Sequence, residues 1–186
     1  MRVITGSAKG RKLKAPKGMT TRPTTDRVKE ALFSVLASKV EDARMLDLFA
    51  GSGGIGIEAL SRGAQSVVFI EENPKVIAII NDNLLMTGLM SGAKVYRNDV
   101  YRGLEKLRDQ PKFDIIFMDP PYEQGHEVAC IKLIQAYNLL LEDGLVVVES
   151  SKRDELPEQI GDLSMIRSQH YGDTKLTYYS IQNGQA

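Results

Sequence analysis

Along most of the chain, short apolar runs alternate with segments in which apolar side chains recur every three to four positions. The runs predict strands over residues 45–49, 66–70, 94–97, 113–118 and 145–149. The intervening segments predict helices over residues 55–62, 74–87, 101–109 and 126–141, with Gly144 following the end of the last one. This alternation favours an α/β fold, in which helices cover both faces of a mostly parallel sheet.

The two ends of the chain depart from this alternation. Residues 3–5 and 11–13 can pair as a small β-hairpin, and a helix is expected to begin at Thr25 or Asp26, either of which can cap it. Residues 164–171 and 175–181 predict an antiparallel hairpin at the sheet edge. We therefore expect seven strands, an N-terminal hairpin extension over residues 1–25 and one domain over residues 26–186. Tyr178 and Tyr179 alternate in the last strand, so at most one is expected to face the core.

The even charge balance hides a strong asymmetry. The 186 residues carry 24 basic and 24 acidic side chains, but residues 1–30 hold nine of the basic and two of the acidic ones. That segment is therefore +7 and the remainder −7. Such a concentration of positive charge favours a polyanionic partner, although a solvated basic hairpin gives the same count. The single cysteine, Cys130, excludes a disulfide framework. No apolar segment suits a signal peptide or a membrane span, so we expect a cytoplasmic protein.

A glycine-rich loop follows the first predicted strand. Gly51, Gly53 and Gly56 match the pattern G-x-G-x-x-G, and glycines at the start of a helix let a ligand approach free backbone N–H groups. Glu71 ends the next strand twenty residues after Gly51, where a carboxylate can accept hydrogen bonds from a ribose. This pattern fits a dinucleotide-dependent enzyme as well as a methyltransferase, and a tight turn without a ligand is the third interpretation.

Two further carboxylates favour the methyltransferase. Asp47 precedes Gly51 by four residues and suits a cationic ligand such as the amino group of methionine, whereas a pyrophosphate gains nothing from a negative neighbour. Asp99 ends the third predicted strand and could read an adenine edge together with Val100, or it could simply cap the next helix. We therefore expect S-adenosylmethionine as the cofactor. The candidate cofactor-binding residues are Asp47, Ala50, Gly51, Ser52, Gly53, Gly56, Glu71, Asp99 and Val100.

The segment Asp119-Pro120-Pro121-Tyr122 directly follows the fourth predicted strand. The carboxyl ends of parallel strands form the ligand crevice of an open sheet, so this segment should face the glycine-rich loop. A base amine is a poor nucleophile, but Asp119 and the Pro120 carbonyl can each accept one of its hydrogens and favour a pyramidal nitrogen. The prolines stiffen the loop, and Tyr122 can stack on the base. These four residues are the predicted catalytic site, with a simple turn as the alternative.

Together these motifs resemble the class I, Rossmann-like S-adenosylmethionine methyltransferases that modify amines. More narrowly, the chain resembles the bacterial small-subunit methyltransferase D family over nearly its whole length, including residues 2–6, 10–13, 22–30 and 171–174. The resemblance implies methyl transfer to N2 of a guanine in 16S rRNA, within an assembling small subunit. One departure is Gly6-Ser7-Ala8, which stands where that family often has an aromatic residue. An adenine-N6 methyltransferase acting on RNA or DNA is the alternative, followed by an NAD-dependent oxidoreductase and a non-catalytic RNA-binding module.

The basic residues near the N-terminus are then candidate RNA contacts, since cations hold phosphates without reading sequence. The candidates are Lys9, Arg11, Lys12, Lys14, Arg22, Thr24 and Arg27. Arg22 and Arg27 rank first because they flank a proline turn at a helix start, although either could form an ion pair with Asp26 or Glu30 instead. No set of side chains has metal-ligand spacing, so we expect no metal, and we expect a monomer.

Overall fold

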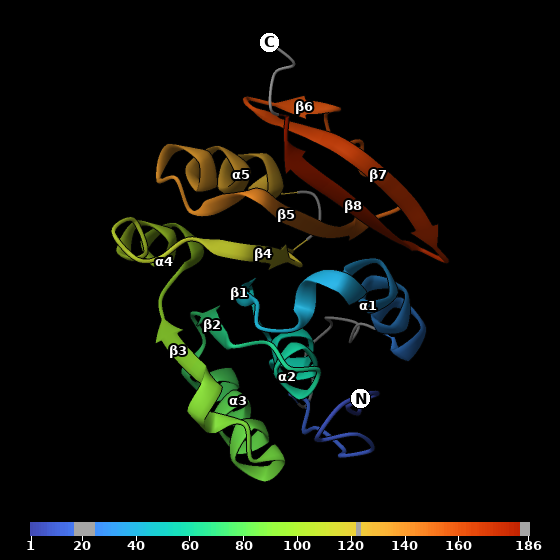
Figure 1. The fold of residues 1–186 in the computed structure, drawn as a ribbon, viewed down its shortest axis with the longest axis vertical. Helices are drawn as coiled ribbons and strands as arrows, with labels where there is room; N and C mark the ends of the chain where they lie inside the picture. The colour runs from blue at the N-terminus through green and yellow to red at the C-terminus, as the bar shows by residue number, and fades with distance from the viewer. Residues whose placement is uncertain (17–24, 122–123, 183–186) are drawn as a thin grey trace.

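The computed structural model describes residues 1–16, 25–121 and 124–182, and these form one eight-stranded sheet with helices on both sides (Figure 1). The strands are β1 (Arg44–Leu48), β2 (Ser66–Glu71), β3 (Ala93–Arg97), β4 (Phe113–Met118), β5 (Leu140–Ser151), β6 (Gln159–Ile160), β7 (Leu163–Tyr171) and β8 (Thr174–Ile181). The helices are α1 (Asp26–Val40), α2 (Gly54–Ser61), α3 (Pro74–Thr87), α4 (Val100–Lys106) and α5 (His126–Ala136), with a 3-10 turn, η1 (Met90–Gly92).

The sheet order is β3-β2-β1-β4-β5-β8-β7-β6. Strands β1 to β5 run parallel, whereas β8, β7 and β6 are joined to them by antiparallel pairing. The α/β class, the parallel sheet and the C-terminal hairpin predicted from the sequence are thus confirmed. The predicted count of seven is wrong, because a two-residue strand pairs with Leu163 and Ser164 at the outer edge. A strand of two residues is too short to be predicted from its pattern of apolar residues.

The two faces of the sheet each have their own apolar core. Helices α1, α2 and α3 cover one face, and α4 and α5 cover the other (Figure 1). Tyr178 packs into the first core and Tyr179 into the second, and both side chains are fully buried. The expectation that at most one of these tyrosines is buried is therefore wrong, since β8 is covered on both faces.

The helix predicted over residues 126–141 ends early, at Ala136. Asn138 adopts a left-handed φ of 52°, and Leu140 already belongs to β5. Phe113 pairs with Leu140 and Ile115 with Leu145, so β5 bulges between these points and takes Gly144 into the strand. The apolar run 139–141 continues a helical pattern equally well, which is why the sequence alone placed it in the helix.

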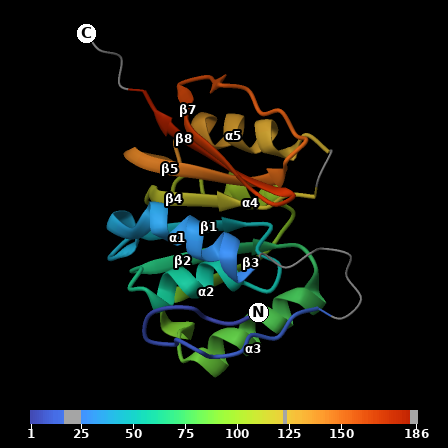
Figure 2. The same cartoon turned by 90° about the vertical axis from the view of Figure 1, so that its right-hand side faces the viewer.

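Residues 1–16, here named the N-terminal strap, form the predicted short hairpin, but its arms are residues 1–3 and 10–13 and not 3–5 and 11–13. An antiparallel bridge joins Arg2 to Lys12, and three backbone hydrogen bonds of 2.8 to 3.0 Å link the same arms. The strap lies across α2 and reaches α3 (Figure 2). Gly6 has a φ of +88°, and any Cβ there would collide with the backbone of Ser61, so the two chains touch backbone to backbone.

The strap also contributes apolar side chains to the first core. Val3, Ala8 and Leu13 are buried there. At its start, the sulfur of Met1 rests where a Cβ of Gly54 would otherwise lie, at the first residue of α2. The strap is thus packed against the helix that opens with the glycine-rich loop.

Candidate active site

Carboxylates from five neighbouring strands meet at one edge of the sheet. Asp47 lies on β1, Glu71 ends β2, and Asp99 follows β3. Asp119 directly follows β4, and Glu149 lies near the end of β5. Because parallel strands end at a common edge, the fold brings the four acids that the sequence analysis selected separately together with Glu149.

The glycine-rich loop is shaped by two left-handed residues, Gly51 with a φ of 54° and Gly53 with a φ of 76°. A Cβ at Gly51 would meet nothing closer than the Phe49 carbonyl oxygen at 3.9 Å, so the space beside the loop is open to a ligand. Gly53 caps α2 without a side-chain hydrogen bond. Phe49 is itself left-handed, with a φ of 58°, a strained conformation that is common at functional sites.

Asp47 is almost fully buried, with 2% of its surface exposed. Its Oδ2 accepts a hydrogen bond of 3.0 Å from the Gly56 N–H, inside the first turn of α2. The pKa of Asp47 is raised to about 8, chiefly by burial, with the Gly56 N–H opposing the shift and the nearby Glu71 adding to it. This carboxyl group is therefore poised to ionise when a cation is placed next to it.

Glu71 joins the end of β2 to the glycine-rich loop. Its carboxylate accepts hydrogen bonds from the N–H groups of Gly51, at 3.1 Å, and of Asn73, at 2.9 Å. Each carboxylate oxygen has a second lone pair, so the group retains acceptor capacity for a ligand hydroxyl.

Asp99 serves as the N-cap of α4. Its Oδ1 accepts hydrogen bonds of 3.1 Å from the N–H groups of Tyr101 and Arg102. Asp99 therefore has the capping role considered from the sequence. Its side chain is still 40% exposed at the carboxyl ends of the parallel strands. Val100 is buried beneath it, against the second core.

Asp119 stands in an acidic environment. Burial raises the pKa of Asp119 well above its usual range, and Glu149 and Asp47 raise it further. The register pairs Met118 with Val148, which sets Asp119 and Glu149 side by side at the ends of β4 and β5. Asp119 is thus favoured in its neutral form until a cation or a proton acceptor arrives.

Glu149 was missed by the sequence analysis. It is 3% exposed and ends a run of four buried apolar residues, 145–148. The rule that selected Asp47 and Asp119, an acid at the carboxyl end of a buried parallel strand, would have found it too. In the remainder of the catalytic motif, Pro120 is buried and Pro121 is exposed, whereas Tyr122 lies outside the described residues.

Three aromatic side chains from the glycine-rich loop, α4 and α5 gather at this edge. The His126 ring lies 5.5 Å from the Phe49 ring and 5.8 Å from the Tyr101 ring, between centroids. Its Nδ1 is 2.7 Å from the Tyr101 hydroxyl, and its Nε2 is 3.0 Å from Gln124. The His126 ring is thus hydrogen-bonded through both nitrogens, and its place beside the site required the fold to be known.

The candidate RNA contacts divide into three groups. Lys9, Arg11, Lys12 and Arg27 are exposed on the strap and on α1. Lys14 is exposed as well, but its Nζ lies 2.8 Å from Asp82. Arg22 and Thr24 lie outside the described residues. Asp26, considered as a partner for the flanking arginines, pairs with Arg2 at 3.0 Å.

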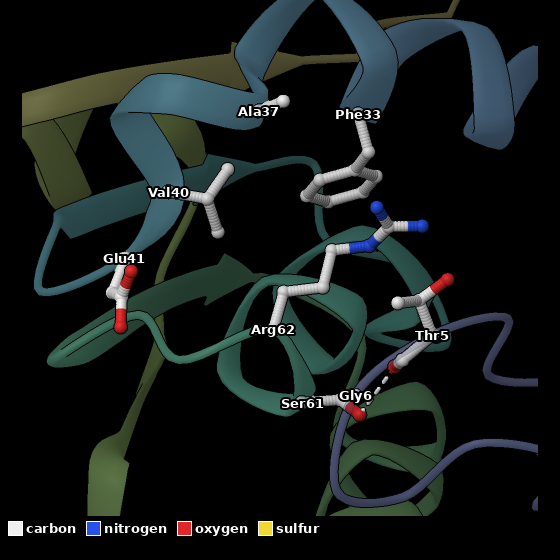
Figure 3. A pocket seen from close by; sticks show the side chains of 8 residues that line it. All are labelled: Thr5, Gly6, Phe33, Ala37, Val40, Glu41, Ser61 and Arg62. Carbon is white, nitrogen blue, oxygen red and sulfur yellow. Dashed lines mark hydrogen bonds between the residues drawn. The ribbon is translucent and has the colours of Figure 1, made fainter.

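Two surface hollows lie away from the acidic edge. One of about 280 Å³ is lined by residues of the strap, α1 and α2, and there the Arg62 guanidinium lies 4.6 Å from the centre of the Phe33 ring (Figure 3). The other, of about 400 Å³, lies near the amino ends of β1 and β2 and includes Arg44 and Ser66. The sheet edge that carries Asp47, Asp119 and Glu149 is therefore identified as the candidate site by its side chains and not by a cavity volume.

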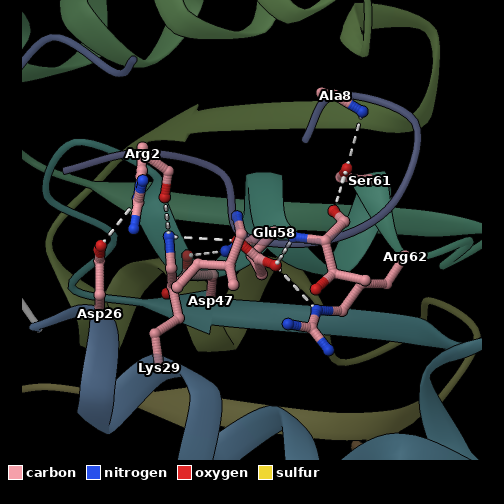
Figure 4. Close-up of polar contacts among 11 residues, drawn as sticks. Arg2, Ala8, Asp26, Lys29, Asp47, Glu58, Ser61 and Arg62 are labelled. Carbon is pink, nitrogen blue, oxygen red and sulfur yellow. Dashed lines mark hydrogen bonds and ion pairs between the residues drawn. The ribbon is translucent and has the colours of Figure 1, made fainter. Parts of the chain in front are cut away.

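A buried ionic cluster fastens the strap to α2 (Figure 4). Glu58 accepts hydrogen bonds from the N–H groups of Ile4, at 2.8 Å, and Thr5, at 3.0 Å. The same carboxylate lies 3.2 Å from the Lys29 Nζ and 2.8 Å from the Arg62 Nε. Lys29 also donates to the Arg2 carbonyl, and burial lowers the pKa of Lys29 despite the opposing effect of Glu58.

Within the described ranges, no group of three or more histidine, cysteine or carboxylate side chains is arranged to hold a metal ion. None of the helices in that part of the chain is long and apolar enough to cross a membrane.

Comparison with known proteins extends over nearly the whole chain. A family model described as "Conserved hypothetical protein 95" matches residues 1–180. YlbH of Bacillus subtilis, whose name assigns it provisionally to the rRNA methyltransferases, is 47% identical over 180 residues, covering 96% of this chain and 98% of its own. The Escherichia coli ribosomal RNA small subunit methyltransferase D is 36% identical over 179 residues, covering 96% and 89%. The solved structure of Escherichia coli yhhF, described provisionally as a methyltransferase, superposes with a TM-score of 0.84 at 36% identity, covering 98% of each chain.

Proposed function

The chain belongs to the family described as Conserved hypothetical protein 95, and from that premise we propose that it is an S-adenosylmethionine-dependent methyltransferase acting on small-subunit ribosomal RNA. We further propose that it modifies the N2 amine of one guanine in 16S rRNA. The observation that carries this proposal is the position of Asp119 and Pro120 at the end of β4. They lie at the same edge of the sheet as Asp47 and the glycine-rich loop, where the parallel strands have their carboxyl ends.

The residues at this edge suit the proposed cofactor. Asp47, buried and protonated below about pH 8, gains a partner when the cationic amino acid end of the cofactor binds. Gly51 leaves open space beside the loop, Glu71 can accept from the ribose hydroxyls, and Asp99 with Val100 would face the adenine. When bound, S-adenosylmethionine supplies a methyl group activated by its positively charged sulfur.

The chain's own part in the reaction is to present the amine. Asp119 and the Pro120 carbonyl accept the two amine hydrogens and hold the nitrogen lone pair toward the cofactor, so positioning supplies much of the rate. Alkylation places a positive charge on the nitrogen, which then loses a proton readily. The positive charge of a bound cofactor would favour ionisation of Asp119, and the resulting carboxylate would then receive this proton. The proposed role of Tyr122 is to stack on the base.

The exposed cations of the N-terminal strap would contact phosphates of the RNA. Lys9, Arg11 and Lys12 point to this role by their exposure, and Arg22, Thr24 and Arg27 are proposed to continue the contact toward α1. Lys14 contributes less, because its charge is shared with Asp82. We propose residues 1–25 as the RNA-facing extension of the methyltransferase domain, acting as a monomer on an assembling small subunit.

A strain that lacks the gene tests the reaction and the residue together. Its 16S rRNA, analysed by primer extension and mass spectrometry, is expected to lack one N2-methylguanosine. The wild-type gene and the control variant Asp109→Ala, which changes an exposed aspartate, should restore it, whereas Asp119→Ala should not. Restoration by Asp119→Ala would refute the assigned catalytic role. Loss of an N6-methyladenosine instead would identify the adenine enzyme.

A further inference from the structure

Asn83, on α3, links the N-terminal strap directly to the glycine-rich loop. Its side chain is fully buried. The Oδ1 atom accepts a hydrogen bond of 2.8 Å from the Lys14 N–H, and the Nδ2 atom donates 3.0 Å bonds to the carbonyls of Lys14 and Ser52. One amide group therefore holds the backbone of both segments at once.

This link lies where the two proposed binding surfaces meet. Ser52 stands between the two left-handed glycines of the cofactor loop. Lys14 lies three residues after Arg11 and two after Lys12, and both of these cations are exposed. Since a buried polar group left unpaired is costly, Ser52 cannot move far without breaking its bond to Asn83 and disturbing the anchorage of the strap.

Other contacts brace the two sides of this bridge. Met1 rests against Gly54, and Glu58 binds the strap one turn further along α2. These contacts hold the strap on the helix, but among the described residues Asn83 is the one side chain whose hydrogen bonds join the strap to the loop. The Lys14 side chain does not substitute for it, because its partner Asp82 is on the exposed side of α3.

We propose that Asn83 is a positioning residue through which cofactor binding and RNA binding strengthen each other, an inference that rests on the function proposed above. A cofactor that holds the loop at Gly51 and Gly53 fixes the Ser52 carbonyl, and Asn83 passes this constraint to the chain at Lys14. The strap is then held in the position in which its cations meet the RNA. By thermodynamic reciprocity, bound RNA strengthens cofactor binding by the same factor.

The coupling is measured as the ratio of two dissociation constants. The probe is the small ribosomal subunit purified from a strain that lacks the gene, titrated with and without saturating S-adenosylhomocysteine. The wild-type protein is expected to bind about five- to tenfold more tightly when S-adenosylhomocysteine is present. In Asn83→Ala the ratio should fall below about twofold, while the matched control Asn81→Ala, an exposed position of the same helix, should keep the wild-type ratio.

Kinetics and hydrogen exchange separate coupling from simple loss of structure. At saturating S-adenosylmethionine, Asn83→Ala should raise the KM for small subunits and leave kcat unchanged, which general unfolding would not do. In the wild-type protein, S-adenosylhomocysteine alone should slow exchange of the Lys14 amide hydrogen, which Asn83 binds.

The outcomes distinguish this inference from the function on which it rests. An unchanged Lys14 exchange rate, a wild-type ratio of one, or a full ratio in Asn83→Ala overturns the coupling while leaving the methyltransferase proposal intact. Charge reversal at Arg11 and Lys12 tests the RNA surface itself and should weaken binding and flatten its salt dependence. A wild-type protein that binds neither S-adenosylhomocysteine nor small subunits overturns the proposed function and the coupling together.

Discussion

Two buried acidic regions of this protein differ in what surrounds their carboxylates. Glu58, in the cluster that fastens the strap, meets two cationic side chains and two backbone N–H groups. At the sheet edge Asp47 is also buried and Asp119 is half-buried, but the charges of described residues that raise their pKa values are other carboxylates. The chain thus completes the first region itself, whereas none of the described cations forms an ion pair with Asp47 or Asp119.

This difference separates structural from functional acids. Burying a charge is costly, so a fold that supplies every partner uses the group to hold segments together. Acids that lie close together in a poorly solvated site raise one another's pKa values and lower the stability of the fold, and such sites are commonly functional. The substitutions below test the contrast in both regions.

The largest effect is expected for Glu58→Ala. This change leaves Lys29 buried without its carboxylate and removes the acceptor for the strap, so the free energy of unfolding should fall by about 3–5 kcal/mol. Urea denaturation measures it, with Glu105→Ala, at an exposed position of α4, as the control. A loss below about 1 kcal/mol would show that the cluster contributes little to the fold.

Asp47→Asn should have the opposite sign and a somewhat smaller size. The folded-state pKa of about 8 lies above the usual value, so the folded protein binds more protons and wild-type stability falls as the pH rises from about 4 to about 8. Asparagine needs no proton and can still accept from Gly56. Without cofactor, the variant should therefore be more stable by roughly 2–4 kcal/mol at pH 7.5, with no gain below about pH 4. Equal pH profiles in thermal unfolding would contradict this assignment.

Cofactor binding should respond to the same ionisation. Because the proposed ligand cation requires the charged form of Asp47, binding of S-adenosylhomocysteine to the wild-type protein should tighten by up to about tenfold per pH unit as the pH rises toward 8. Isothermal titration at several pH values measures this slope. Asp47→Asn should bind more weakly and show a flatter slope, and a steep slope in that variant would assign the proton to another group.

The smallest effect is expected for Asp82→Ala. This aspartate pairs with Lys14, but both side chains are more than half exposed. Water and salt screen such a pair, so the loss of stability should stay below about 1 kcal/mol. Chemical denaturation of this variant beside Glu58→Ala compares the exposed ion pair of the strap with the buried ion pairs of Glu58. Similar losses would remove the distinction between the two.

Much of the fold was predictable because it depends on local pattern. The N-cap at Thr25 and the start of α3 at Pro74 were predicted, because a helix cap is formed by residues that are close together in the sequence. The parallel strands followed from buried apolar runs, and the acids at their ends followed from topology. What these acids bind stays a prediction.

Contacts between distant segments could not be predicted in this way. No spacing in the sequence connects Asn83 with Lys14 or Glu58 with Ile4, since these pairs lie more than fifty residues apart. The aromatic group around His126 likewise draws on one loop and the first turns of two helices. Even the early end of α5 depended on whether residues 139–141 found a strand partner in β4.

The position of Met1 has a practical consequence for handling the protein. Its sulfur rests against Gly54, at the start of the helix that follows the cofactor loop, so an affinity tag fused to this end would begin beside the proposed site. The end of β8, by contrast, lies toward the far edge of the sheet (Figure 1). A carboxyl-terminal tag is therefore the better choice for binding measurements, and a difference between the two tagged forms would itself report on the strap.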